Sequence, residues 1–310
     1  MNTEGKKIEK FIFIFIFLFS SYILYNPFLK SRNILLEFTS GTVLILALSC
    51  AIYIIYFSFF KNFPRAASGT ALLLSAASAI FYTKIFFKKL SGSANIYSGK
   101  SFVFFGILII LLICFYALRN PKSIVYSSII ISPIIILCTG ICALSLIYVK
   151  FPQVCEIIPQ EKFDPMFFKY VLYILPDIFL CLYFYDNISC QKGTMDFKLF
   201  FMSALTLAAF LYAEQAKYLF LFGQNGIVEI IYPDKTAYSL MTFFNARELF
   251  SVSNTLAYFI KMSVYSCCLY KSLTFLTQSR KISKKIIFPL CFAILAVLTE
   301  FFALCGNFVK

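Results

Sequence analysis

The stretch LYILPDIFLCLYFYDN, residues 172–187, decides the fold class. It is apolar over more than a helical turn on each side of Pro176 and Asp177. Similar apolar runs recur along the 310-residue chain, which is 61% hydrophobic, whereas a soluble domain has roughly 45–50% apolar residues. Runs of about 18 or more apolar residues are typical of membrane-spanning helices. The sequence therefore predicts an all-α polytopic membrane protein.

Nine membrane-spanning segments are predicted within a single domain, residues 1–310. The third is rich in alanine and serine (AASGTALLLSAASAIFY), which favours close contact between helices. No A-x-A-like cleavage site follows the N-terminal apolar run, so we expect a retained first helix. The distribution of lysine and arginine favours an N-terminus on the cytoplasmic side. The predicted spans are 11–29, 34–60, 66–87, 101–118, 123–149, 167–187, 197–220, 253–276 and 286–305.

The composition argues against several classes of protein. The chain has no His, which removes histidine acid–base catalysis, histidine metal sites and haem ligation. Its 11 Cys lie mostly within apolar runs and show no paired metal-ligand spacing. The formal charge of +14 comes from basic residues at the ends of apolar runs, which suits lipid headgroups rather than nucleic acid. We therefore expect no enzyme activity, no cofactor and no metal.

Four stretches carry motifs that follow one another along the chain. They are IYIIYFSFFKNFPRAASG (52–69), FYALRNPKSIVYSSIIISPIIIL (115–137), LPDIFLCLYFYDN (175–187) and IIYPDKTAYSLMTFFNARELFSVSNTLAYFIKMSVYSCCLY (230–270). Together they resemble the spore-germination permease family, the membrane subunits of nutrient germinant receptors in the amino-acid permease superfamily. Arg119 matches the family's Y-A-x-R-x-G segment, where Pro121 replaces the glycine. Asp177 falls on the acidic position of its G-F-E-x-L-L-L segment, and Lys261 lies in its F-I-K-x-S-x-Y segment.

The resemblance implies an inverted-repeat amino-acid permease (LeuT-like) architecture of about nine to ten transmembrane helices. Such folds bind substrate near the midplane of the membrane, where the first and sixth helices are interrupted. The family has about ten helices, whereas this chain ends just after the ninth predicted span. The resemblance also implies that residues 221–252 form an extracellular, partly re-entrant cap over the site.

Asp177 and Pro176 are the first candidates for a ligand site. A carboxylate at the centre of a spanning helix costs about 2.5–3.5 kcal/mol on insertion scales, so it seldom faces lipid. Proline donates no backbone hydrogen bond and disturbs the preceding turn. The pair predicts a broken helix lining a polar cavity, where Asp177 receives the ammonium of a ligand or a proton. The alternative is a simple kink, with the carboxylate bonded to a neighbouring tyrosine or lysine.

Ser20 and Ser21 are the only small polar pair at a comparable depth of the first predicted helix. We expect the matching interruption there, with the two hydroxyls binding a ligand carboxylate. The alternative is that they bond back to the helix carbonyl one turn earlier.

Lys261 lies some eight residues inside the eighth predicted span. It either pairs with Asp177, or supplies a fixed charge where related transporters hold Na⁺, or extends its ammonium toward the membrane surface. Glu214 and Lys217 are three residues apart, which predicts a local ion pair on one helix face rather than a site.

Three functions follow from these observations and the resemblance. The first is a membrane subunit of a nutrient germinant receptor, which binds an amino acid and acts with partner subunits in the spore inner membrane or the bacterial cell membrane. The second is a proton-coupled amino-acid transporter, with Asp177 carrying the proton. The third is a scaffold subunit that binds no ligand.

Overall fold

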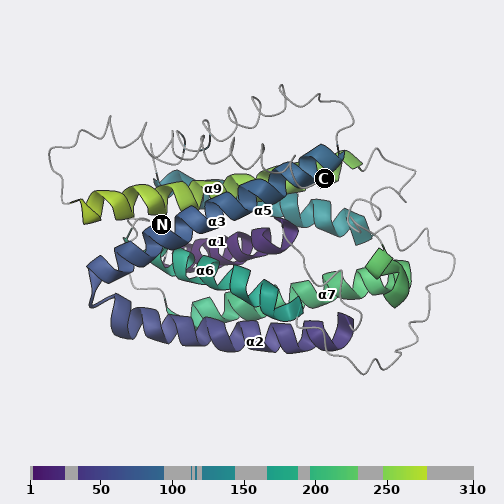
Figure 1. Cartoon of the computed structure of the whole chain (residues 1–310), viewed down its shortest axis with the longest axis horizontal. Coiled ribbons are helices and arrows are strands. Elements are labelled where there is room, and N and C mark those ends of the chain that lie inside the picture. Colours follow the sequence, from purple (N-terminus) through teal and green to yellow (C-terminus); the bar gives the residue numbers. More distant parts are fainter. Residues whose placement is uncertain are drawn as a thin grey trace, which may run out of the picture. The chain divides into compact units, whose positions relative to one another are not determined.

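The structure is a computed structural model, and every regular element in the part of the chain that it describes is a helix (Figure 1). It describes residues 3–24, 34–93, 113, 116, 121–143, 166–187, 196–229 and 247–277. Its elements are α1 (Thr3–Leu24), α2 (Ile34–Ile55), the short π-helix η2 (Tyr56–Phe60), α3 (Pro64–Ser93), α5 (Pro121–Ala143), α6 (Met166–Asn187), α7 (Phe197–Glu229) and α9 (Arg247–Leu276). The expected all-helical fold is therefore confirmed for these residues.

Four helical segments are long and apolar enough to cross a membrane, as judged over the described ranges alone. They are Gly41–Phe60, Pro64–Phe86, Pro121–Ile141 and Phe197–Phe222, and they coincide with four of the nine predicted spans. Apolar side chains on these segments point away from the rest of the protein: Leu73 is 72% exposed and Ile130 is 69% exposed. A lipid environment suits such side chains, because it removes them from water.

The other five predicted spans differ in how much of each the structure describes. Three of them coincide with α1, α6 and α9. The ninth, 286–305, lies outside the described residues, and of the fourth, 101–118, only positions 113 and 116 are described. The count of nine to ten helices and the LeuT-like architecture stay predictions.

The helices fall into two compact units, with unit boundaries inside α2, α5, α6 and α9. The first unit comprises Met1–Ala51, Ser128–Leu175 and Asp196–Ala257, and the second comprises Ile52–Ser127, Pro176–Met195 and Tyr258–Lys310. Whether the chain forms a single domain, as the sequence predicts, stays a prediction.

In the first unit, α1 packs along α7. Every side chain from Phe13 to Leu24 of α1 is buried, as expected for a helix that is apolar on all faces. The ring of Phe210 on α7 meets Phe19 edge-on at 4.8 Å between ring centroids, and Phe15 at 5.9 Å. These aromatic contacts join the two helices.

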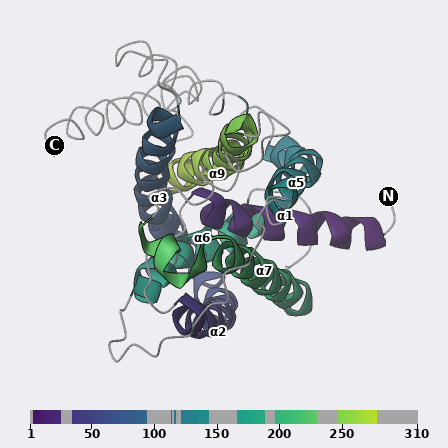
Figure 2. The same cartoon turned by 90° about the vertical axis from the view of Figure 1, so that its right-hand side faces the viewer.

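In the second unit, α3 runs beside the second half of α9 (Figures 1 and 2). The buried face of α3 consists mainly of alanine and serine, among them Ala67, Ser68, Ala71, Ser75, Ser78 and Ala79. Small residues let helix backbones approach closely. The burial of these side chains agrees with the prediction that this face turns away from lipid, and close packing of helix backbones against it stays a prediction.

Candidate functional site

The helix that carries Asp177 is continuous. α6 is α-helical from Met166 to Asn187 with Pro176 inside it, so the predicted break at Pro176 is wrong. Proline removes one backbone hydrogen bond from a helix, but a helix in an apolar environment keeps its other bonds, because the polar groups would otherwise have no partner. Pro176 therefore sits within a helix and does not open a gap in it.

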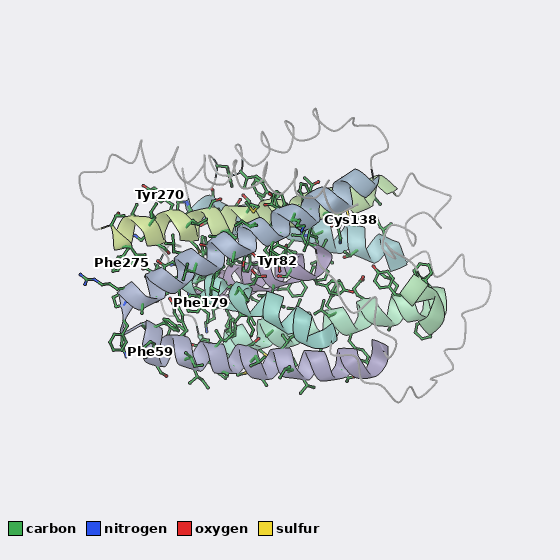
Figure 3. The ribbon with its side chains drawn as sticks, viewed as in Figure 1. Phe59, Tyr82, Cys138, Phe179, Tyr270 and Phe275 are labelled. Atoms are coloured by element: carbon green, nitrogen blue, oxygen red, sulfur yellow. The ribbon has the colours of Figure 1, made fainter. Side chains whose placement is uncertain are left out.

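The carboxylate of Asp177 is held by three side chains from two neighbouring helices. Tyr82 on α3 donates a hydrogen bond to Oδ2 at 2.8 Å, and Tyr265 on α9 donates one to Oδ1. The Nζ atom of Lys261 on α9 lies 3.0 Å from Oδ2. Figure 3 labels Tyr82 on α3. α3, α6 and α9 thus meet at one carboxylate, and each of its oxygens accepts a hydrogen bond from a tyrosine.

Lys261 does not extend toward a surface. Its side chain and that of Asp177 have no solvent exposure, so extension toward the membrane surface is wrong and pairing with Asp177 is confirmed. The ammonium also lies over two rings, 5.4 Å from the centroid of Tyr82 and 5.9 Å from that of Tyr265. Both distances fall within the range of cation–π attraction. The two rings stack, with centroids 6.0 Å apart and planes 25° from parallel.

Uncharged polar contacts lie on each side of the ion pair along the same helices. Toward the C-terminus of α3, the hydroxyls of Thr83 and Tyr258 are 2.9 Å apart, and the Tyr258 ring stacks on Phe86 at 4.1 Å between centroids. In the other direction, the Tyr183 hydroxyl lies 3.1 Å from Ser68 and accepts a bond from Ser272 at 3.1 Å. The pair is therefore the charged centre of a longer polar interface.

The end of α6 contacts η2. Tyr56 donates to Asp186 at 3.4 Å and accepts from Asn187 at 3.1 Å. Its ring meets Phe179 edge-on at 5.5 Å between centroids (Figure 3, where Phe179 is labelled). Asp186 and Asn187 are exposed, so polar groups follow α6 from the buried Asp177 to an exposed end.

Ser20 and Ser21 are both buried on α1, in the first unit. Ser20 donates to the carbonyl of Ile16, one turn earlier, at 2.6 Å, which is the alternative weighed from the sequence. α1 is continuous to Leu24, so the predicted interruption at these serines is wrong. Ligand binding by Ser20 or Ser21 stays a prediction.

Two further predictions concern α7 and its surroundings. Glu214 and Lys217 form an ion pair within α7, so the expected local pair is confirmed. Of the predicted cap, 221–252, both ends are helical, because α7 continues to Glu229 and α9 already begins at Arg247. The cap itself stays a prediction. The positions between those two helices lie outside the described residues.

Sequence reasoning missed the two tyrosines that hold Asp177. Tyr265 lies one turn after Lys261, so the two side chains share a helix face. Tyr82 follows Ser68 and Ser75 at seven-residue intervals on α3, which also places it on the helix face that carries those two buried serines. Because the chain has 20 Tyr, these spacings single out Tyr82 and Tyr265 only after the position of Asp177 is known.

Comparisons with known proteins give no match: no family model matches the chain, and no curated protein is recognisably similar to it. The likeness to spore-germination permeases therefore rests on the motifs quoted above.

Proposed function

We propose that the chain is the membrane subunit of a spore nutrient-germinant receptor, which binds an amino acid at Asp177 and Lys261 and acts with partner subunits. In this proposal it has nine to ten spans, a LeuT-like architecture and a place in the spore inner membrane or the bacterial cell membrane. The motifs that resemble spore-germination permeases supply the receptor role. The four membrane-length helices support the membrane location.

The proposed ligand class rests on one observation. The carboxylate of Asp177 and the ammonium of Lys261, both without solvent exposure, lie 3.0 Å apart. Burying two opposite charges costs more free energy than burying apolar residues of the same volume, so such a pair adds little to stability. Ionisable groups inside membrane proteins usually serve binding or transport. An amino acid carries the same two charges, and its ammonium and carboxylate match Asp177 and Lys261, respectively.

A signalling step then needs no covalent chemistry. A ligand shifts a protein between two arrangements only by binding one of them better than the other. An amino acid that engages both charges replaces one internal ion pair with two pairs to the ligand. The arrangement with Asp177 and Lys261 apart is thereby favoured, and partner subunits receive the change.

The test is thermal stability of the purified, detergent-solubilised protein across a panel of amino acids. Mass action requires that a ligand of the folded state raise the melting temperature. We expect at least one amino acid to do so in the parent chain and to fail with Asp177→Asn. A ligand that stabilises parent and variant equally would remove Asp177 from the site.

The second candidate is a proton-coupled amino-acid transporter. The observation that favours it is that Lys261 and two tyrosine hydroxyls all contact one carboxylate, because protonating Asp177 would abolish the ion pair and release Lys261. Proteoliposomes with an inward proton gradient separate the two functions. Concentrative uptake of a binding amino acid identifies a transporter, and binding without uptake identifies a receptor.

A further inference from the structure

The ammonium of Lys261 is surrounded by the kinds of group that bind organic cations. Asp177 supplies a carboxylate oxygen at 3.0 Å, and Tyr82 and Tyr265 supply ring faces at 5.4 and 5.9 Å. A carboxylate beside aromatic faces is a common way for proteins to bind organic cations. Here the bound cation belongs to the chain itself.

The three groups around the ammonium are held in place independently of Lys261. Each tyrosine donates a hydrogen bond to a different oxygen of Asp177, and the two rings stack on each other. Asp177 has no solvent exposure, and both tyrosine rings are likewise buried. Lys261, in contrast, reaches the site on a four-carbon stem with several rotatable bonds. The lysine is therefore the part best able to leave.

We infer that Asp177, Tyr82 and Tyr265 form a binding cage for a primary ammonium group, which Lys261 occupies as a tethered ligand in the structure described here. A free alkylammonium ion would take the same place once Lys261 is removed or displaced. A tethered group acts at an effective concentration in the millimolar range, so the parent chain resists competition from dilute amines.

In the proposed function, on which this step rests, the ligand is an amino acid. Lys261 then competes with the ammonium of that ligand for the cage. The ammonium of a bound amino acid would enter the cage and expel Lys261, and the displaced lysine would then meet the ligand carboxylate. The contact of Lys261 with the cage would therefore mark the ligand-free arrangement.

The experiment is chemical rescue of Lys261→Ala by n-butylammonium chloride, measured as melting temperature in detergent. We expect Lys261→Ala to melt lower than the parent, and butylammonium to restore roughly 2–4 °C in a saturable way. The double variant Asp177→Asn with Lys261→Ala should show no saturable gain. Tetramethylammonium, which offers no N–H to the carboxylate, should rescue less, and sodium chloride at equal ionic strength controls for salt.

A saturable gain of the same size in the double variant, or none in Lys261→Ala, would overturn the cage. If Lys261→Ala cannot be recovered folded, the readout becomes its yield with and without butylammonium during membrane extraction. Recovery only with the amine supports the cage, and failure in both conditions, while the double variant is recovered, refutes it. Because no nutrient is used, this result is independent of the amino-acid panel that tests the proposed function.

Discussion

The rings of Tyr82 and Tyr265 come from two different helices, stack at 6.0 Å and donate to opposite oxygens of one buried carboxylate. Each phenolic hydroxyl thus donates to a carboxylate oxygen that has no solvent exposure. Hydrogen bonds to a charged group contribute more than those between neutral groups, about 1.5–3 kcal/mol each. Both tyrosines therefore stabilise the contact between α3, α6 and α9.

Removing either phenolic hydroxyl should weaken the fold while keeping its shape. We expect Tyr82→Phe and Tyr265→Phe each to lower the free energy of unfolding by about 1.5–3 kcal/mol, because the ring remains and only the hydrogen bond is lost. Tyr126→Phe, at an exposed tyrosine of α5, is the matched control and should change little. Thermal or denaturant unfolding in detergent measures the effect, and equal losses at all three positions would argue against the hydrogen-bonded carboxylate.

The ion pair makes a prediction about coupling. Asp177→Asn and Lys261→Met should each destabilise the protein by about 3–5 kcal/mol, because each leaves one buried charge without its partner. The double variant removes both charges and should cost clearly less than the sum of the two. A double-mutant cycle from unfolding curves measures the difference. Strict additivity would mean that the two residues do not interact in the folded protein.

The small-residue face of α3 predicts a sharp positional contrast. Ala71→Leu adds three carbon atoms to a fully buried position and should destabilise by about 1–3 kcal/mol or more through overpacking. The same change at Ala77, which is exposed on the same helix, should be close to neutral. Helix propensity cancels in the comparison, since the substitution and the helix are identical. A similar loss at both sites would contradict close packing of this face.

The topology can be tested with introduced cysteines. With the N-terminus inside and seven spans before it, position 235 is expected to face outward. Lys235→Cys should react with a membrane-impermeant thiol reagent in intact cells, in a background cleared of other exposed cysteines. Lys281→Cys, after the eighth predicted span, should react only once the membrane is opened. The reverse pattern would invert the predicted orientation.

The sequence predicted most of the helices and part of the site. Apolar length located the helices well, because that signal is summed over many residues. The pairing of Asp177 with Lys261 was one of three alternatives that the sequence left open, because a lysine can also avoid burial by extending toward the membrane surface. The helix ends were less accurate: α7 extends nine residues beyond its predicted end, through Gly223, Asn225 and Gly226, which are residue types that more often end a helix.

The errors share a physical cause. Pro176, Ser20 and Ser21 were interpreted as breaks, yet α6 and α1 are continuous. One missing hydrogen bond is a small loss for a long helix whose remaining bonds have no competing partner in an apolar environment. Whether a proline interrupts a helix therefore depends on the surrounding packing, which the sequence near the proline does not contain. The same holds for Tyr82, whose role depends on a helix about 95 residues away in the chain.

The shared carboxylate also bears on how the protein is made. In the nine-span arrangement that we propose, Asp177 enters the membrane with α6, and its lysine partner follows about 84 residues later in the chain. At about 5–20 residues per second, translation leaves the acid without that partner for roughly 4–17 s. Tyr82 on α3 precedes Asp177 in the chain, whereas Tyr265 and Lys261 both arrive with α9. In this arrangement, the full set of contacts to Asp177 that the structure describes forms only after α9 has been inserted.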